Sequence, residues 1–120
     1  KEKLEVLNAI IHPAVAKHFE DWCSAQKTHH YILKEAAILF ESGAYLQTDK
    51  IISVVAPIEL RINRTMKRDA VSEEMVKQRI NNQLSDEEKI KRSDYIIYND
   101  EKQLIIPQIL HIHQQLLQLK

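Results

Sequence analysis

Apolar and polar positions alternate with a helical period over the first quarter of the chain. The largely apolar positions recur every three or four residues, at Leu4, Leu7, Ile11, Val15, His18 and Trp22. This spacing predicts a helix from about residue 3 to about residue 26, with one apolar face. Pro13 interrupts the pattern, and proline disfavours helix for the residue before it. We therefore expect a break or kink at His12-Pro13, with His12 at the start of the second helical piece.

Three later segments are apolar runs that predict strands. They cover residues 31–39, 51–55 and 95–98. Turn-forming residues end the first run at Ser42-Gly43 and the last at Asn99-Asp100. Continuous rather than alternating hydrophobicity is typical of strands covered on both faces, as in a parallel sheet with crossover helices. The pattern therefore predicts an α/β fold.

Two helices are predicted from proline positions. Pro57 precedes a helical pattern from residue 58 to about residue 68, and Pro107 suits the start of a last helix. The apolar stripe of that last helix, with spacings of three, four and three, consists of Ile109, Ile112, Leu116 and Leu119. Both helices follow a predicted strand.

Two more helices are predicted from their caps. Ser72 is followed by acidic residues that suit a first turn, which predicts a helix over about 73–83. Ser85-Asp86-Glu87-Glu88 is a capping box and predicts a helix over about 86–92.

Composition narrows the possible functions. A chain of 120 residues with 44% hydrophobic and 28% charged residues has the balance of one globular domain. Seventeen Lys and Arg residues cancel seventeen Asp and Glu residues, so no overall field attracts nucleic acid or an anionic membrane. No apolar run approaches the roughly 20 residues that span a bilayer. Cys23 is the single cysteine, which excludes an internal disulfide framework and favours a reducing cytoplasm. We expect a soluble protein with no nucleic-acid or membrane partner.

The glycine content excludes the common phosphate-binding loops. Gly43 is the single glycine, so these residues contain neither G-x-x-x-x-G-K-[ST] nor G-x-G-x-x-G. His111 and His113 are two residues apart and point to different sides of a helix, so we expect no metal site. His12 is read as a packed or capping histidine on pattern alone. No nucleophile or paired-carboxylate motif stands out, and we expect no catalysis by these residues unaided.

A cluster of cations is the strongest chemical signal. Arg61, Arg64 and Arg68 lie at i, i+3 and i+7 and share one helical face, with Lys67 beside them. Either a bound phosphate or a solvated, salt-bridged surface accounts for this face, and spacing alone favours the second because charged helix surfaces are common. Asp69 is the expected internal partner.

Five segments in order resemble one enzyme family, dephospho-CoA kinase. They are Leu-Asn-Ala-Ile-Ile-His-Pro-Ala-Val at 7–15, Ala-Ile-Leu-Phe-Glu-Ser-Gly at 37–43, Val-Val-Ala-Pro at 54–57, Arg-Ile-Asn-Asn-Gln at 79–83 and Asp-Tyr-Ile-Ile-Tyr-Asn at 94–99. Arg64 and Arg68-Asp69 lie between the third and fourth segments, as in the family. Each segment is weak evidence alone, whereas five at the family's spacing are specific.

The resemblance implies a reaction and a fold. The family transfers the γ-phosphoryl group of ATP to the 3′-hydroxyl of dephospho-CoA, the last step of coenzyme A biosynthesis, with Mg²⁺ assisting. The implied fold is a partial P-loop kinase fold, a three-layer α/β/α arrangement that is helix-rich here. Its implied parts are 1–30 in the helical CoA-binding region, 31–63 in the core, 64–92 as the lid, and 93–120 as the last core strand and helix.

The resemblance also implies site residues. The family's lid arginine corresponds to Arg64, a catalytic and ATP-binding residue. Arg68 is expected beside it at the ATP, and Asn99 matches an asparagine near the adenine. His12 matches the His-Pro on the substrate side. These roles fit phosphoryl transfer, which needs cations over the transferring oxygens and a lid that excludes water.

The chain departs from the family pattern at its beginning. Members begin with a strand, a glycine loop and an acidic base on the next strand, none of which is present here. We therefore expect a C-terminal part of such a kinase, inactive alone and cytoplasmic. The absent strand would lie between 31–39 and 51–55, so unpaired edges predict self-association.

Two alternatives stay open at this point. The chain is also compatible with part of another small-molecule or nucleoside monophosphate kinase, although His12-Pro13 favours the CoA enzyme. It is also compatible with a helical interaction module that presents Arg61, Arg64 and Arg68 to an acidic protein partner.

Overall fold

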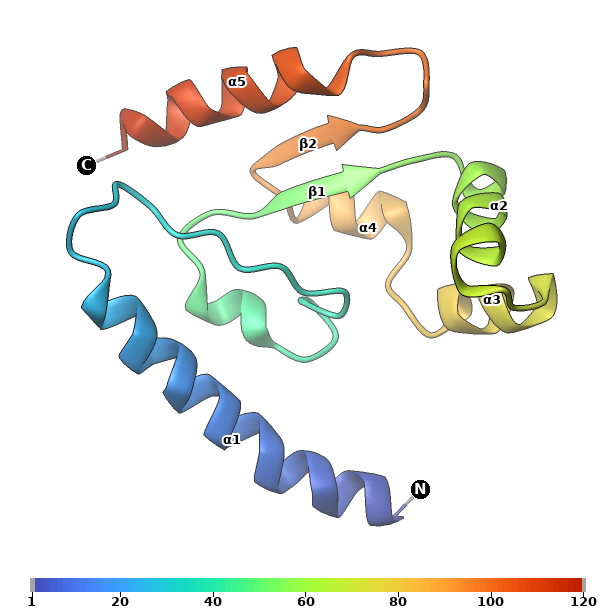
Figure 1. Ribbon diagram of the computed structural model, residues 1–120, viewed down its shortest axis with the longest axis horizontal. Helices are drawn as coiled ribbons and strands as arrows, with labels where there is room; N and C mark the ends of the chain where they lie inside the picture. Colours follow the sequence, from blue (N-terminus) through green and yellow to red (C-terminus); the bar gives the residue numbers. More distant parts are fainter. Residues whose placement is uncertain (1, 120) are drawn as a thin grey trace. The chain divides into compact units, whose positions relative to one another are not determined.

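The computed structural model describes residues 2–119, with the side chains of Glu2, Leu4 and Asn8 excepted. It divides into two compact units, Lys1–Lys34 and Glu35–Lys120 (Figure 1). The first unit holds one long helix, and the second holds a small sheet with its helices.

Helix α1 occupies most of the first unit. It runs without interruption over Glu2–Ala25 and contains Pro13. The predicted break at His12-Pro13 is therefore wrong, as is a helix start at His12, whereas a kink at Pro13 stays a prediction. His12 lies within the helix with an exposed side chain. Proline removes one intrahelical hydrogen bond, and a helix of 24 residues retains the bonds on both sides of it.

The apolar face predicted for this helix is largely exposed within the described unit. Leu7, Val15 and Trp22 are 50%, 59% and 47% exposed. Near the C-terminal end of α1, Phe19 stacks on Trp22 with ring centroids 6.0 Å apart. Lys34 Nζ lies 4.5 Å from the centroid of the Phe19 ring. The helical period in the sequence thus predicted the helix, while its apolar side chains do not bury one another.

A parallel pair of strands forms the sheet of the second unit. Strand β1, Ile52–Val55, pairs with β2, Tyr95–Tyr98, in the register Ile52 to Tyr95 and Val55 to Tyr98. The predicted strands at 51–55 and 95–98 and their parallel arrangement are confirmed. The predicted cover on both faces of the strands is wrong for β1 within the described residues, because Val54 is 62% exposed.

The third predicted strand, over 31–39, is wrong. Residues 31–36 have no regular secondary structure, and residues 37–43 form turns before the 3-10 helix η1, Ala44–Gln47. Local bonds replace strand pairing, since Ser42 N–H donates to Ile38 O at 3.0 Å and Gly43 N–H donates to Phe40 O at 3.1 Å. The apolar run is used for packing instead, because Phe40 is buried and tilts against Tyr45.

Four helices complete the second unit. They are α2, Ile58–Asp69; α3, Glu73–Asn81; α4, Asp86–Lys91; and α5, Ile105–Leu117. The caps follow the prediction: Ser72 Oγ accepts from Met75 N–H at 3.4 Å, and Ser85 Oγ accepts from Glu88 N–H at 3.3 Å. Pro57 lies at the N-cap of α2, and Pro107 lies in the first turn of α5.

The core of this unit joins the helices to the sheet. Its buried apolar side chains come from different elements: Phe40, Ile62, Val76, Ile97 and Ile112. Helix α5 packs along β2, α4 contacts β1, and α2 packs against α3 (Figure 1). Of the stripe predicted on α5, Ile112 is buried, while Ile109 is 47% exposed. Helices α5 and α4 therefore pack against the sheet, whereas α2 and α3 pack against each other.

Within the described residues, none of the helices has the length and apolar character needed to cross a membrane.

Candidate functional site

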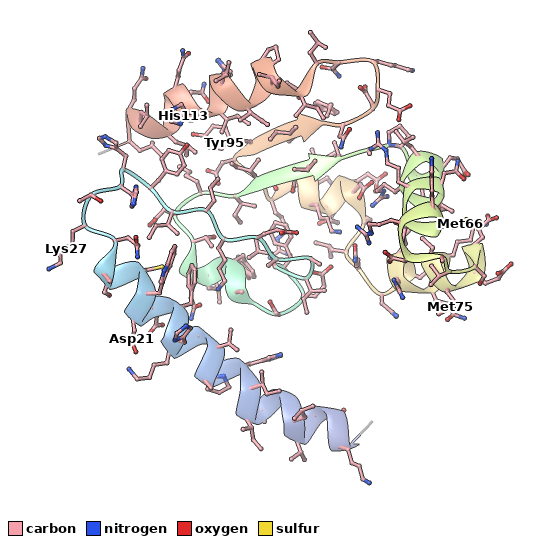
Figure 2. The ribbon with its side chains drawn as sticks, in the orientation of Figure 1. Asp21, Lys27, Met66, Met75, Tyr95 and His113 are labelled. Atoms are coloured by element: carbon pink, nitrogen blue, oxygen red, sulfur yellow. The ribbon has the colours of Figure 1, made fainter. Side chains whose placement is uncertain are left out.

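A cleft of about 330 Å³ lies between α2 and α3. The two helices are joined by a tight turn in which Ala70 adopts a left-handed conformation with φ of 53°. Ile62 of α2 and Val76 of α3, each 2% exposed, fix the pair. Figure 2 draws the side chains of this pair, with Met66 on α2 and Met75 on α3 labelled.

Four arginines line the cleft. They are Arg61, Arg64 and Arg68 of α2 and Arg79 of α3; Thr65, Val76, Ile80 and Gln83 complete the lining. The shared face of the first three is as the helical spacing predicts. The chemical reading of the sequence did not include Arg79 in the site. The family segment at 79–83 begins with this arginine and could have indicated it. Arg79 lies on α3, which packs against α2.

Each of these arginines has a carboxylate partner. Arg61 Nη2 lies 2.8 Å from Asp86 Oδ2, and Arg64 Nη2 lies 3.0 Å from Glu101 Oε1. Asp69 serves two arginines, accepting from Arg68 Nε at 2.7 Å and from Arg79 Nη1 at 3.1 Å. The predicted pairing with Asp69 is confirmed for Arg68, whereas Arg61 and Arg64 have other partners. Four guanidinium groups and three carboxylates leave one positive charge in excess around the cleft.

These ion pairs change the acidity of Asp69. The hydrogen bond from Arg68 lowers the pKa of the Asp69 carboxyl below its usual value, and the bond from Arg79 adds to the effect. In return, the Asp69 carboxylate raises the pKa of Arg68. The cluster stays charged over the physiological range, as anion binding requires.

One donor of the cluster is unused. Arg61 Nε is buried and has no hydrogen-bond partner among the described residues. A buried donor without an acceptor carries a free-energy cost. The cleft has two properties of an anion site, an excess of positive charge and room for a ligand.

The structure brings together three of the four residues named from the sequence. Arg64 and Arg68 both line the cleft. Asn99 follows β2, and its backbone carbonyl accepts from Arg64 Nη1 at 3.3 Å. His12 lies on α1 in the other unit. Among the described residues, no group of three or more His, Cys, Asp or Glu side chains is arranged to hold a metal ion.

A family model described as dephospho-CoA kinase matches residues 1–104 of the chain. The chain belongs to the dephospho-CoA kinase family. This membership sets aside the alternative of another small-molecule or nucleoside monophosphate kinase.

Curated relatives agree with the assignment. The dephospho-CoA kinase of Bacteroides fragilis (strain YCH46) is 46% identical over 106 residues, covering 88% of this chain and 52% of that protein. The dephospho-CoA kinase of Fusobacterium nucleatum is 41% identical over 100 residues, covering 83% of this chain and 51% of that protein. The chain thus spans about half the length of the curated relatives it matches.

A solved structure supports the fold. The crystal structure of TT1252 from Thermus thermophilus matches with a TM-score of 0.87 and 29% sequence identity, over 95% of this chain and 59% of that one. The predicted α/β class, with the partial P-loop kinase fold of the dephospho-CoA kinase family, is confirmed.

Proposed function

We propose that this chain works as part of a dephospho-CoA kinase, which transfers the γ-phosphoryl group of ATP to the 3′-hydroxyl of dephospho-CoA. The observation that carries the proposal is the four-arginine cleft between α2 and α3 in a chain of this family. Guanidinium groups present planar pairs of donors that match phosphate oxygens, and they remain charged at any physiological pH.

Arg64 is the proposed catalytic cation. In phosphoryl transfer, negative charge is spread over the oxygens of the transferring group, and a positioned cation stabilises it. Arg64 suits this role because it links α2 to the end of β2 through Asn99. Parallel α/β sheets bind ligands beyond the carboxyl ends of their strands, which is where this contact lies.

Other residues have supporting roles in the proposal. Arg68 binds the ATP phosphates, Asn99 lies near the adenine, and His12 lies on the substrate side. The proposed parts are 1–30 in the CoA-binding region, 31–63 in the core, 64–92 as the lid, and 93–120 as the last strand and helix. In this scheme α2 carries the arginines from the core into the lid.

Magnesium enters the proposal only as the ion that accompanies ATP in the family's reaction. Among the described residues, no group of three or more His, Cys, Asp or Glu side chains is arranged to hold it. Kinases hold Mg²⁺ with substrate phosphates and one or two protein oxygens. The proposed role of the arginines is electrostatic, through their own positive charge on the phosphate oxygens.

The remaining proposals concern location and partners. We infer a cytoplasmic enzyme whose partners are ATP and dephospho-CoA, with no nucleic-acid or membrane partner, from the balanced charge and the absence of a long apolar run in the sequence. We also propose that the chain self-associates.

A chimera tests the function. These residues would replace the matching 106 residues of the Bacteroides fragilis enzyme, which is named dephospho-CoA kinase. We expect the chimera to phosphorylate dephospho-CoA with ATP, and the 120 residues alone to show no activity above a no-protein control, because they lack a phosphate-binding glycine loop.

Two results would contradict this assignment. The first is a folded chimera that binds neither ATP nor dephospho-CoA, which would favour the interaction-module alternative. The second is phosphorylation by the 120 residues alone, which would show that catalysis needs no glycine loop and that the site lies elsewhere.

A further inference from the structure

Glu101 has an unusual backbone conformation beside the arginine cleft. Its φ of 63° lies in the left-handed region, which glycine occupies easily and glutamate does not. Among the described residues, Ala70 is the other non-glycine residue with positive φ. The turn is held by Asp100 Oδ1, which accepts from the N–H groups of Lys102 and Gln103, each at 3.0 Å. After this turn, the Glu101 side chain reaches Arg64 in the middle of α2.

The Glu101 side chain occupies one terminal nitrogen of Arg64. Arg64 Nη2 donates to Glu101 Oε1 at 3.0 Å, while Nη1 donates to the carbonyl of Asn99 at 3.3 Å. Both terminal nitrogens of the Arg64 guanidinium therefore donate a hydrogen bond to the segment that follows β2. A phosphate oxygen that approaches the Nη2 side of Arg64 meets the repulsion of the Glu101 carboxylate, and it gains the N–H that Glu101 holds only when this carboxylate moves away.

We propose that Glu101 competes with a bound anion for Arg64, so that its carboxylate leaves Arg64 Nη2 when a polyphosphate takes this position. This inference rests on the proposed function of Arg64. The ligand class is a nucleoside triphosphate or another polyphosphate, whose terminal oxygens have the charge and geometry that the carboxylate imitates. The exchange makes no covalent bond and needs no further reactant.

Glu101 is better suited to leave than the other carboxylates of the cleft. Its side chain is 66% exposed and meets Arg64 through a single oxygen. Asp69 is 27% exposed and is shared by two arginines, and Asp86 is 31% exposed at the start of α4. An exposed pair with one hydrogen bond is the weakest of these contacts, so an incoming anion displaces it first.

Binding of tripolyphosphate to the 120-residue chain tests the proposal. Isothermal titration at low ionic strength would compare wild type, Glu101→Gln, Arg64→Ala and the double variant. Glu59→Gln is the matched control, because it removes one exposed negative charge from the same helix that carries Arg64. We expect Glu101→Gln to tighten binding by about two- to fivefold, the range that an exposed ion pair contributes, and the control to change it by less.

The double variant separates competition from overall charge. Glu101→Gln should tighten binding only when Arg64 is present, so its effect should vanish in the Arg64→Ala background. Two results would overturn the competitor role. One is that Glu101→Gln still tightens binding in the Arg64→Ala background, and the other is that Glu59→Gln tightens binding as much as Glu101→Gln does. If Glu101→Gln fails to fold, Glu101→Gly gives the same test, since glycine accepts a φ of 63° and removes the carboxylate.

The same measurements distinguish the two proposals. If Arg64→Ala weakens binding while Glu101→Gln leaves it unchanged, Arg64 is an anion-binding residue and Glu101 is not its competitor. If Arg64→Ala leaves binding unchanged, both the anion-binding role of Arg64 and the competition by Glu101 are wrong.

Discussion

The carboxylate of Asp69, at the end of α2, lies 3.1 Å from the guanidinium of Arg79 on α3. The same carboxylate also accepts two hydrogen bonds from Arg68, at 2.7 and 3.2 Å. One side chain therefore fixes two arginines from different helices at the rim of the cleft. Because like charges repel, this shared acid allows both arginines to stay close without a ligand.

Replacing Asp69 by Asn should lower the thermal unfolding midpoint at neutral pH, because the amide cannot carry the charge that Arg68 and Arg79 share. The pKa of Asp69 is lowered in the folded state, chiefly by the Arg68 hydrogen bond. Its stabilisation is therefore present above the unfolded pKa and is lost as pH falls through the folded pKa. Unfolding midpoints measured from pH 7 downward should converge for wild type and variant. Asp49→Asn, at an exposed site outside the cleft, is the control.

Replacing Arg64 by Ala in the chimera should lower kcat by about 10²-fold or more, because the cation acts mainly on charge that develops in the transition state. Arg64→Lys should recover only part of the activity, since an ammonium group cannot reproduce the guanidinium fork. Steady-state kinetics measure both. Lys67→Ala, at an exposed neighbouring cation outside the cleft lining, is the control. A kcat within twofold of wild type for Arg64→Ala would make Arg64 an ordinary surface cation.

Replacing Asp94 by Asn should destabilise the sheet by about 1 kcal/mol at neutral pH, as expected for a partly exposed charge-assisted hydrogen bond. Asp94 accepts from Lys50 Nζ at 2.7 Å and from Ile51 N–H at 2.9 Å, and so ties the starts of β1 and β2 together. The Lys50 bond first and then the Ile51 bond lower the pKa of Asp94. The stabilisation should therefore disappear as pH falls through that lowered pKa.

Denaturant unfolding at several pH values checks the Asp94 prediction. Lys50→Ala is the companion variant, since it removes the cation and leaves the bond to Ile51 N–H in place. It should cost less than Asp94→Asn at neutral pH. Equal curves for wild type and Asp94→Asn at every pH would mean that water replaces the carboxylate without loss.

Replacing Ala70 by Gly should stabilise the second unit by about 0.5–1 kcal/mol, because Ala70 follows α2 with φ of 53°, where glycine avoids the clash of the alanine methyl group. Lys67→Gly, on an exposed position within the same helix, should instead destabilise by about 0.5–1 kcal/mol. Opposite signs in denaturant unfolding would support the assignment. A loss of stability in Ala70→Gly would mean that the left-handed turn is not populated.

The chain should self-associate at micromolar concentration. The apolar runs of the sequence predict three strands, whereas the described residues form a sheet of two, in which each strand has one unpaired edge. Val54 of β1 is 62% exposed on this small sheet, and an unpaired apolar strand favours pairing with a second chain. Sedimentation should show a species heavier than the 14.1 kDa monomer, and Val54→Lys should reduce it. A single compact monomer would contradict the prediction.

The sequence by itself determined the elements that depend on local chemistry. Ser72 and Ser85 predicted where α3 and α4 begin, because a hydroxyl that accepts from a backbone N–H three residues later needs no distant partner. The apolar runs at 51–55 and 95–98 predicted the two parallel strands for a similar reason, since each run and the proline or turn residues that follow it lie close together in the sequence. The ordered segments shared with dephospho-CoA kinases predicted the family.

The tertiary structure decided what depends on partners far apart in sequence. The apolar run at 31–39 had the composition of a strand, but turn bonds and the packing of Phe40 took the place of a neighbouring strand. Arg64 could not be paired with Glu101 by pattern, since 37 residues separate them. The spacing of residues in the sequence shows which side chains share one face of a helix. Which residues pack against that face depends on the tertiary fold. The cleft and its carboxylates are therefore properties of the packed helices and the turn after β2.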